Sequence, residues 1–174
     1  MHKYKTIVVD PPWPQRKTGA RKSRPNQKQN LDYPTMSLSE ISALPILSIS
    51  EENSVLFLWV TQKFLPQSFE IMKGWGFRYQ RVITWDKQNG MCLFGFHHRT
   101  EFCLFGYRGQ INAFPKRKAI PTVFFAKSER HSAKPDCFYD MVSVFGSPYL
   151  DVFARKERAG WDVFGNEVES SIEL

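Results

Sequence analysis

The segment Asp10-Pro11-Pro12-Trp13 has the residue types that most directly suggest chemistry. It follows an uninterrupted apolar run, residues 6–9, which predicts a buried strand that the two prolines must end. A carboxylate and a rigidly held proline carbonyl could together bind the two protons of an exocyclic amine, and the indole could stack on a planar base. Such a set suits a base flipped out of its stack. The same residues also fit a strand terminator followed by a core tryptophan, and four residues alone leave both interpretations open.

The net charge of +7 is concentrated around this motif. Eight of the first 30 residues are basic and Asp10 is the only acid among them, whereas the basic and acidic residues after them balance. Residues 14–30 contain no aliphatic side chain larger than that of Ala20, which predicts a mobile basic loop. We expect this loop to follow a phosphate backbone and to cover the flipped base; the alternative is a solvated loop without a ligand.

The composition is that of an ordinary globular chain, with 174 residues, 42% hydrophobic and 24% charged. It predicts a single domain over residues 1–174 that closes with an acidic tail, residues 168–174. No apolar run approaches the ~20 residues that would span a bilayer. Three cysteines cannot all pair internally, which indicates a reducing cytoplasm. The sequence contains no C-x-x-C pair, and its histidines have no third ligand at a suitable spacing, so we expect no metal site.

Apolar runs and breakers predict alternating strands and helices. Ser37 and Glu40 fit a capping box, and Phe138, Met141, Val142 and Phe145 recur at helical spacing. Strands are expected at residues 6–9, 54–60, 81–85, 101–107, 122–126 and 149–153, and helices at about 38–44, 66–75 and 135–145. This alternation predicts an α/β fold with a mostly parallel sheet and helices on both faces. Ligands of such sheets bind beyond the carboxyl ends of strands, which is where the Asp10 motif lies.

Several segments together resemble one family. The Asp10 motif is similar to the catalytic motif of the adenine N(6)-methyltransferases related to the 70-kDa MT-A subunit of the mRNA adenosine methyltransferase. Further segments match this family in order: LDYPTMS (31–37), LFLWVT (56–61), HRTEFCLFG (98–106), HSAKPD (131–136), DVFAR (151–155) and WDVFGNE (161–167). Each segment is weak by itself, whereas the ordered set is specific and spans residues 5–167.

The resemblance implies S-adenosylmethionine as the methyl donor and a Rossmann-like class I methyltransferase fold in the permuted β-class order. It implies that Asp10, Pro11, Pro12 and Trp13 are catalytic. The donor would be held by Asp10, Lys134, Asp151, Phe153, Arg155, Asn166 and Glu167, with Lys134 at its carboxylate. The nucleic acid would be contacted by Trp13, Arg16, Lys17, Arg21, Lys22, Arg24 and Tyr33. Ordinary readings stay open for several of these; Asp151, for example, equally fits a strand-end acid with a structural partner.

Two departures from the family pattern bear on donor binding. Ala154 stands where the family usually has glycine, and only nine residues precede Asp10, where longer relatives have an upstream strand and loop. We therefore expect weak donor binding or binding that depends on a partner. The oligomeric states considered for the protein are a homodimer and a heterodimer.

The function expected from these features is adenine N(6)-methylation of DNA by a cytoplasmic enzyme encoded by a bacterium or a phage. The alternatives are an RNA adenine methyltransferase, a non-catalytic nucleic-acid-binding subunit of the same fold, and a basic-arm binding module without a donor.

Overall fold

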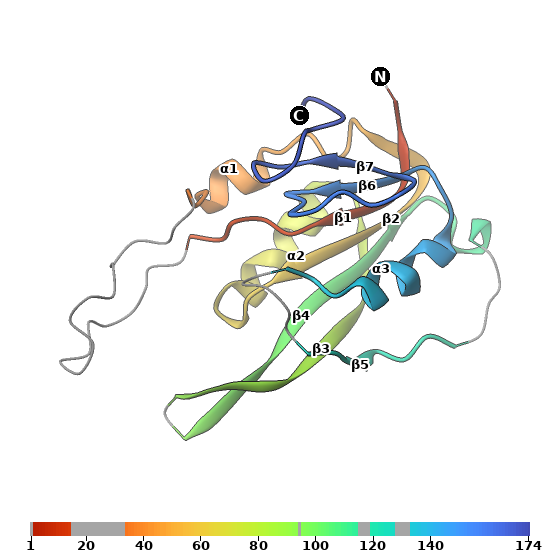
Figure 1. Ribbon diagram of the computed structural model, residues 1–174. Helices are drawn as coiled ribbons and strands as arrows, with labels where there is room; N and C mark the ends of the chain where they lie inside the picture. Colours follow the sequence, from red (N-terminus) through yellow and green to blue (C-terminus); the bar gives the residue numbers. More distant parts are fainter. Residues whose placement is uncertain (1, 15–33, 94, 115–118, 128–132) are drawn as a thin grey trace.

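The computed structural model describes residues 2–14, 34–93, 95–114, 119–127 and 133–174. Within them, seven strands form one sheet in the order β5-β3-β4-β2-β1-β6-β7 (Figure 1). The strands are β1 (Tyr4–Val9), β2 (Ser50–Val60), β3 (Arg78–Leu93), β4 (Phe96–Arg108), β5 (Val123–Phe125), β6 (Tyr149–Val152) and β7 (Trp161–Phe164). The helices are α1 (Leu38–Ser42), α2 (Leu65–Gly74) and α3 (Asp136–Val142), and the 3-10 turns are η1 (Gln62–Phe64), η2 (Ile111–Ala113) and η3 (Ser143–Phe145).

Most strand pairs in this sheet are parallel. β1 lies parallel to β2 and β6, β6 to β7, and β3 to β5, whereas β4 runs antiparallel to both of its neighbours, β2 and β3. This arrangement confirms the predicted α/β fold with a mostly parallel sheet.

Helices cover both faces of the sheet, and side chains that alternate along the central strands supply both cores. In β1, Ile7 and Val9 face a core that includes residues of α1 and α2, whereas Val8 faces a core that includes residues of α3. Figure 1 shows α2 and α3 on opposite faces. Because both faces are buried here, Ile7, Val8 and Val9 are all apolar, and this is why the end of β1 appears in the sequence as a continuous apolar run.

The helix ends follow the local signals. The Ser37 side chain accepts the Glu40 N–H, and the Glu40 carboxylate accepts the Ser37 N–H, so the predicted capping box is confirmed. Proline occupies the first turn of α2, where no N–H is needed. The helix predicted over residues 135–145 is α for only seven residues; it tightens into η3 and ends at Gly146, whose φ is +101°.

The structure differs from the sequence-based elements mainly in the strands. The predicted strand 81–85 lies within β3 and the predicted strand 101–107 is the second half of β4, and both strands continue as a long antiparallel hairpin. The strand predicted to end at Phe153 ends at Val152, because Phe153 has a φ of +67° and cannot extend the ladder. A seventh strand, β7, was not predicted, because its four residues are too short to show a period.

The two terminal features predicted from composition have different outcomes. Residues 15–33, nearly all of the predicted basic loop, lie outside the described residues. Residues 168–174 return to the body, since the Ser171 N–H donates to the Val163 carbonyl at 2.8 Å and Ile172 and Leu174 pack against the core. The expected acidic tail is therefore a packed segment. No helix in the described part of the chain is long and apolar enough to cross a membrane.

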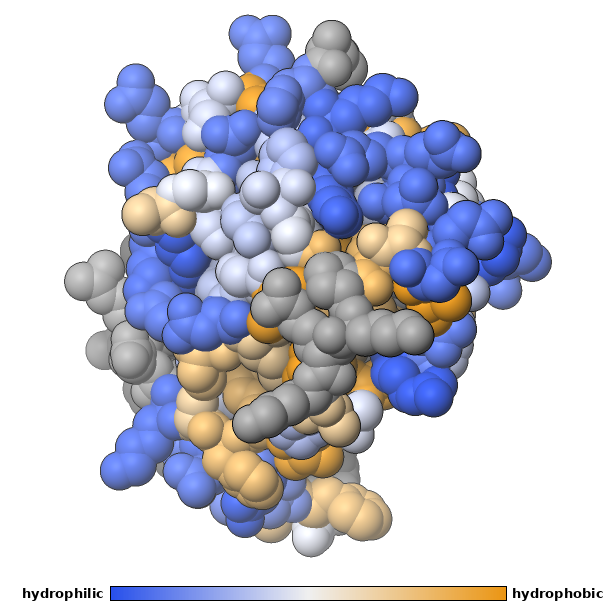
Figure 2. All heavy atoms as spheres, turned by 90° about the vertical axis from the view of Figure 1, so that its right-hand side faces the viewer, coloured by the Kyte–Doolittle hydropathy of each residue, from blue (hydrophilic) through white to orange (hydrophobic). Residues whose placement is uncertain are grey.

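Apolar side chains gather on the face that lies to the right in Figure 1, which Figure 2 turns toward the viewer. Large apolar side chains are exposed in η2 and in β5, namely Ile111 at 54%, Val123 at 44% and Phe125 at 62%. β5 is an edge strand of the sheet, so its outward side chains have only one neighbouring strand.

Candidate active site

Asp10 lies at the carboxyl end of β1, between the ends of β2 and β6. Its N–H donates to the Val152 carbonyl at 3.2 Å, and its side chain is 16% exposed. The two prolines that follow stop the ladder, as predicted. The Pro11 carbonyl accepts the Trp13 N–H at 2.8 Å, which uses one of its two lone pairs and leaves the other for a further donor.

Trp13 belongs to the core in this structure. Its ring is 4% exposed and stacks on Phe64 with 5.6 Å between ring centroids, and its Nε1–H donates to the Trp59 carbonyl at 3.0 Å. The expected open face for stacking a base is therefore not present in this arrangement. Trp13 instead anchors the segment after Asp10 to the ends of β2 and η1.

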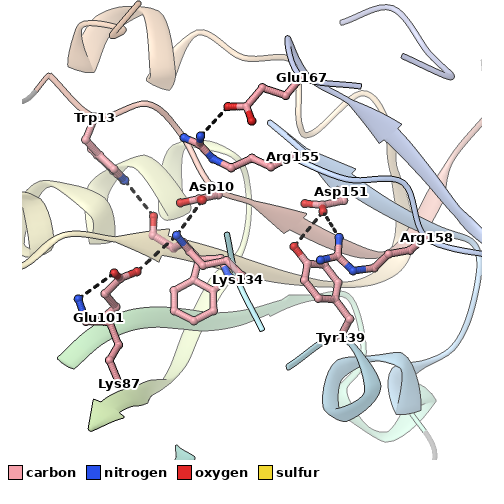
Figure 3. A network of polar contacts seen from close by, with 11 residues as sticks. Asp10, Trp13, Lys87, Glu101, Lys134, Tyr139, Asp151, Arg155, Arg158 and Glu167 are labelled. Atoms are coloured by element: carbon pink, nitrogen blue, oxygen red, sulfur yellow. Dashed lines mark hydrogen bonds and ion pairs between the residues drawn. The ribbon is translucent and has the colours of Figure 1, made fainter. Parts of the chain in front are cut away.

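Lys134 connects Asp10 to a second carboxylate (Figure 3). Its Nζ lies 2.8 Å from Asp10 Oδ2 and 3.4 Å from Glu101 Oε2, and Glu101 Oε1 lies 3.2 Å from Lys87 Nζ. The Lys134 side chain is 6% exposed and its ammonium lies 5.0 Å from the centroid of the Trp59 ring. Four charges of alternating sign thus form a chain that leads outward from Asp10 through β4 to β3.

Burial and neighbouring charges shift the pKa values of Asp10, Lys134 and Glu101. Burial raises the pKa of Asp10 above its usual value, and the ammonium of Lys134 opposes that rise only in part. Burial would by itself lower the pKa of Lys134, but Asp10 and Glu101 outweigh it and raise that pKa. Burial would likewise raise the pKa of Glu101, and the two lysines outweigh it and lower that pKa. Lys134 therefore stays charged, and Asp10 is the member of the chain whose charge is least stabilised.

Beside Asp10 the structure has a small half-open pocket of about 50 Å³. Its lining residues are Asp10, Pro12, Pro34, Phe153, Ala154, Arg155, Asn166 and Glu167. Four of the residues expected to hold a donor, from Phe153 to Glu167, thus meet Asp10 in one place. Ligand pockets of drug-sized molecules are about 300–1,000 Å³, so this pocket can receive only one part of such a molecule.

Two sides of this pocket, the backbone at Ala154 and the turn at Gly165, lie very close to each other. A Cβ on Gly165 would lie 2.4 Å from the Ala154 carbonyl oxygen, so only glycine allows the turn before Asn166 to pack there. Arg155 Nη1 donates to Glu167 Oε1 at 2.6 Å across the same junction. The Gly165-Asn166 pair, readable in the sequence as an ordinary turn, is therefore a turn that places pocket residues.

Asp151 lies in a separate buried network and does not line the pocket. The Tyr139 hydroxyl donates to Asp151 Oδ2 at 2.8 Å, and Arg158 Nη1 lies 3.2 Å from the same oxygen (Figure 3). The Arg158 guanidinium also lies over the Tyr139 ring at 3.3 Å. Burial raises the pKa of Asp151 to about 7. Asp151 is thus a strand-end acid with structural partners, as the sequence also allowed, and its expected contact with the donor stays a prediction.

Other predicted site residues cannot be placed. Arg16, Lys17, Arg21, Lys22, Arg24 and Tyr33 all lie outside the described residues. Conversely, Lys87, Tyr139 and Arg158 enter the two polar networks without having been predicted. No spacing signal could have found them, because their partners are 14, 12 and 7 residues distant along the chain.

Two further observations concern possible ligands. Thr61, which follows the carboxyl end of β2, has a buried Oγ1 without a hydrogen-bond partner among the described residues, so this edge retains an unsatisfied polar atom. Anywhere in the described ranges of the chain, no three His, Cys, Asp or Glu side chains are grouped closely enough to hold a metal ion. Cys103 is fully buried, and burial raises the pKa of its thiol, which makes it unreactive.

Comparison with known proteins agrees with the geometry of this edge. The family model MT-A70 matches residues 4–167. The chain is 28% identical over 190 residues to the Type II methyltransferase M.MunI of Mycoplasma sp, which covers 99% of this chain and 81% of that protein. It is 28% identical to the N(6)-adenosine-methyltransferase MT-A70-like of Arabidopsis thaliana and 26% identical to the N(6)-adenosine-methyltransferase catalytic subunit METTL3 of Homo sapiens. These matches cover 93% and 96% of this chain, which spans only 23% and 28% of those two proteins.

Proposed function

The chain belongs to the MT-A70 family of methyltransferases, and on that premise we propose that it transfers a methyl group from S-adenosylmethionine to the N6 amine of adenine in DNA. The observation that carries the proposal is the position of Asp10. It lies at the carboxyl end of β1, in contact with the charge chain on one side and with the pocket of Phe153, Arg155 and Glu167 on the other. One carboxylate can thus serve an acceptor amine and a donor at once.

The pocket residues have the chemistry to hold one end of the donor. S-adenosylmethionine supplies an electrophilic methyl group when it is bound. Glu167 and Asn166 offer a carboxylate and an amide to hydroxyl or amine groups, and the Phe153 ring offers an apolar wall. Lys134 has three N–H donors, two of which are used by Asp10 and Glu101, so the third can meet the donor carboxylate.

Asp10 and the Pro11 carbonyl are proposed to orient the acceptor. The N6 amine of adenine is a poor nucleophile, because its lone pair is delocalised into the ring. Two acceptors at fixed positions hold its two protons and aim the lone pair. They also stabilise the positive charge that the nitrogen gains as the new N–C bond forms and the bond between the methyl group and the donor sulfur breaks, which leaves the donor as a neutral thioether. The proton then released from nitrogen leaves toward Asp10, whose raised pKa favours a transient proton.

DNA is proposed as the substrate because of the relative that matches in length as well as in sequence. The chain spans 81% of the Type II methyltransferase M.MunI, but about a quarter of the N(6)-adenosine enzymes. The first 30 residues, with eight basic side chains and one acid, supply charge for either nucleic acid. We further propose that Arg16, Lys17, Arg21, Lys22, Arg24 and Tyr33 contact it.

Transfer of tritium from labelled S-adenosylmethionine to DNA and to RNA of the same sequence tests the proposal. We expect label in DNA, recovered as N6-methyladenine. Label in RNA alone would show that the substrate is RNA and not DNA, while the proposed methyl transfer to adenine would stand. Absence of label in both, together with absence of donor binding by calorimetry, would identify a non-catalytic member of the family.

A further inference from the structure

The β3–β4 hairpin extends past the active site. At Trp85 and Glu101 the two strands still lie in the body of the sheet, and from there they continue as a two-stranded ribbon to Leu93 and Phe96. In Figure 1 this ribbon projects beyond the other strands, on the side toward which β1 runs. We call residues 86–100 the β3–β4 arm. Its base adjoins the charge chain, because Lys87 on the arm holds Glu101.

A β-bulge that several independent contacts hold in place lies at the base of the arm. The pairing moves from Asp86 opposite Thr100 to Met91 opposite His98, so residues 87–90 bulge from β3. Within the bulge Gln88 has a φ of +60°, and its N–H donates to Asp86 Oδ1. Non-glycine residues rarely adopt this conformation, and where they do the surrounding structure must hold them.

Residues of β4 make further contacts that hold the bulge in place. Arg99 binds both oxygens of Asp86 at 2.8 and 2.7 Å. His97 Nε2 donates to the Gly90 carbonyl at 2.9 Å. A Cβ on Gly90 would lie 2.3 Å from the His98 carbonyl oxygen, so only glycine fits there. The bulge is therefore a specified feature of the kind that commonly lies next to active sites.

The arm exposes side chains that can contact bases and no carboxylate of its own beyond Asp86, which Arg99 neutralises. Gln88, Asn89 and His98 are exposed, and Phe96 near the tip is 75% exposed, more than any other large apolar side chain of the described residues. Residues 86–128, which include the arm and β5, contain seven basic residues and two acids, Asp86 and Glu101. The arm thus belongs to a second basic part of the sequence, in addition to the first 30 residues.

We propose that the β3–β4 arm lies along the nucleic acid that flanks the target adenine, with Phe96 against the bases and with Gln88, Asn89 and His98 toward base edges. This inference rests on the proposed function. A two-stranded ribbon fits the major groove of B-form DNA, amide side chains bind base edges, and aromatic side chains stack on bases or insert between them. The basic excess of residues 86–128 in the sequence suits a polyanion.

The length of the arm sets how far it reaches. Phe96 is five residues beyond Glu101 along β4, which at about 3.3 Å per residue is about 17 Å. Nucleotides in a stacked strand are about 3.4 Å apart, so the tip reaches about five nucleotides from the target. A substrate that ends sooner cannot meet Phe96.

Equilibrium binding to oligonucleotides of two lengths tests this reach. Each oligonucleotide carries one central adenine, in a total of ~5 or ~17 nucleotides, and is labelled for fluorescence anisotropy. We expect Phe96→Ala to weaken binding of the long one by about tenfold, as stacking contacts do, and to leave the short one unchanged. Ile111→Ala is the matched control: it removes an apolar side chain that is 54% exposed, in η2 after the far end of β4, and is expected to change neither.

Three results would overturn the inference: equal weakening on both lengths, no weakening on either, or a smaller particle mass for Phe96→Ala than for wild type. The last would show that Phe96 contacts a second copy of the chain. If wild type binds both oligonucleotides but transfers no methyl group to them, the proposed function fails while the two-length comparison still decides the role of the arm.

Discussion

Lys134 Nζ lies 2.8 Å from Asp10 Oδ2, and both side chains are largely withdrawn from solvent at the carboxyl edge of the sheet. Glu101 shares the same ammonium from the other side at 3.4 Å. The lysine therefore compensates two partly buried carboxylates at once. The charge of Asp10 depends on residues 91 and 124 positions distant along the sequence.

The first prediction concerns the contribution of Lys134 to stability. Lys134→Met leaves Asp10 and Glu101 without their shared cation, and removing one partner of a buried pair costs about 3 kcal/mol in the free energy of unfolding. Urea unfolding at pH 7 measures this loss. The matched control is Lys156→Met, which breaks an exposed pair with Asp136 and should cost less than about 1 kcal/mol. Equal effects of the two substitutions would show that the Lys134 pairs are no stronger than surface ones.

A second prediction concerns the pKa of Asp10. The charge of Glu101 raises that pKa and Lys134 lowers it. Glu101→Gln removes the first effect and leaves Lys134 to Asp10 alone, so the pKa of Asp10 falls. Because Asp10 acts ionised, the acid limb of the pH profile of kcat/KM should move to lower pH. An acid limb that stays in place or moves to higher pH would contradict this coupling.

A third prediction concerns Asp151 and the pH dependence of stability. Its pKa is raised from 3.8 to about 7 by burial, so the folded protein binds a proton there that the unfolded chain has lost. The stability that this proton provides is present at pH 4 and is lost as the pH rises through 7. Asp151→Asn cannot ionise, so the free energy of unfolding of the variant relative to wild type should rise between pH 5 and pH 8. Thermal or urea unfolding at several pH values measures it, and parallel curves would refute the assignment.

The fourth prediction concerns the turn that carries Asn166 and Glu167. Gly165→Ala drives a Cβ to 2.4 Å from the Ala154 carbonyl oxygen, so the turn must move away from Phe153 and Arg155. We expect weaker binding of S-adenosylmethionine by calorimetry. Gly74→Ala, where a Cβ meets nothing within 4 Å, is the control and should bind as wild type does. Unchanged affinity for Gly165→Ala would place the donor elsewhere.

The sequence predicted those parts of the fold that local signals determine. The apolar run before Asp10 and the Ser37–Glu40 box became β1 and the start of α1, because a strand buried on both faces and a capped helix each have a sequence pattern of their own. The long β3–β4 hairpin was only partly predicted. Its outer half contains glycines and polar residues, and it is held by contacts such as Asp86 with Arg99 that only the pairing of the strands creates.

The sequence predicted which residues belong to the candidate site more completely than it predicted which neighbours their side chains contact. Asp10, Phe153, Arg155, Asn166 and Glu167 meet in one pocket, as the resemblance implied. Trp13 and Asp151 turned inward instead, because a large ring and an acid next to a buried strand can find partners in the core. The spacing of residues along the chain does not determine whether these two side chains point into the core or toward a ligand, because that depends on neighbours in other helices and strands.

The catalytic role of Asp10 is decided by the rate of N6-methyladenine formation by Asp10→Asn, measured by mass spectrometry in a single turnover with saturating S-adenosylmethionine and DNA. The amide keeps the shape of the side chain but lacks the charge that stabilises the developing positive nitrogen. We expect a rate at least about 100-fold below wild type, while Asp136→Asn, at an exposed acid of α3, reacts at the wild-type rate. An Asp10→Asn rate equal to that of wild type would show that the Asp10 carboxylate is not catalytic.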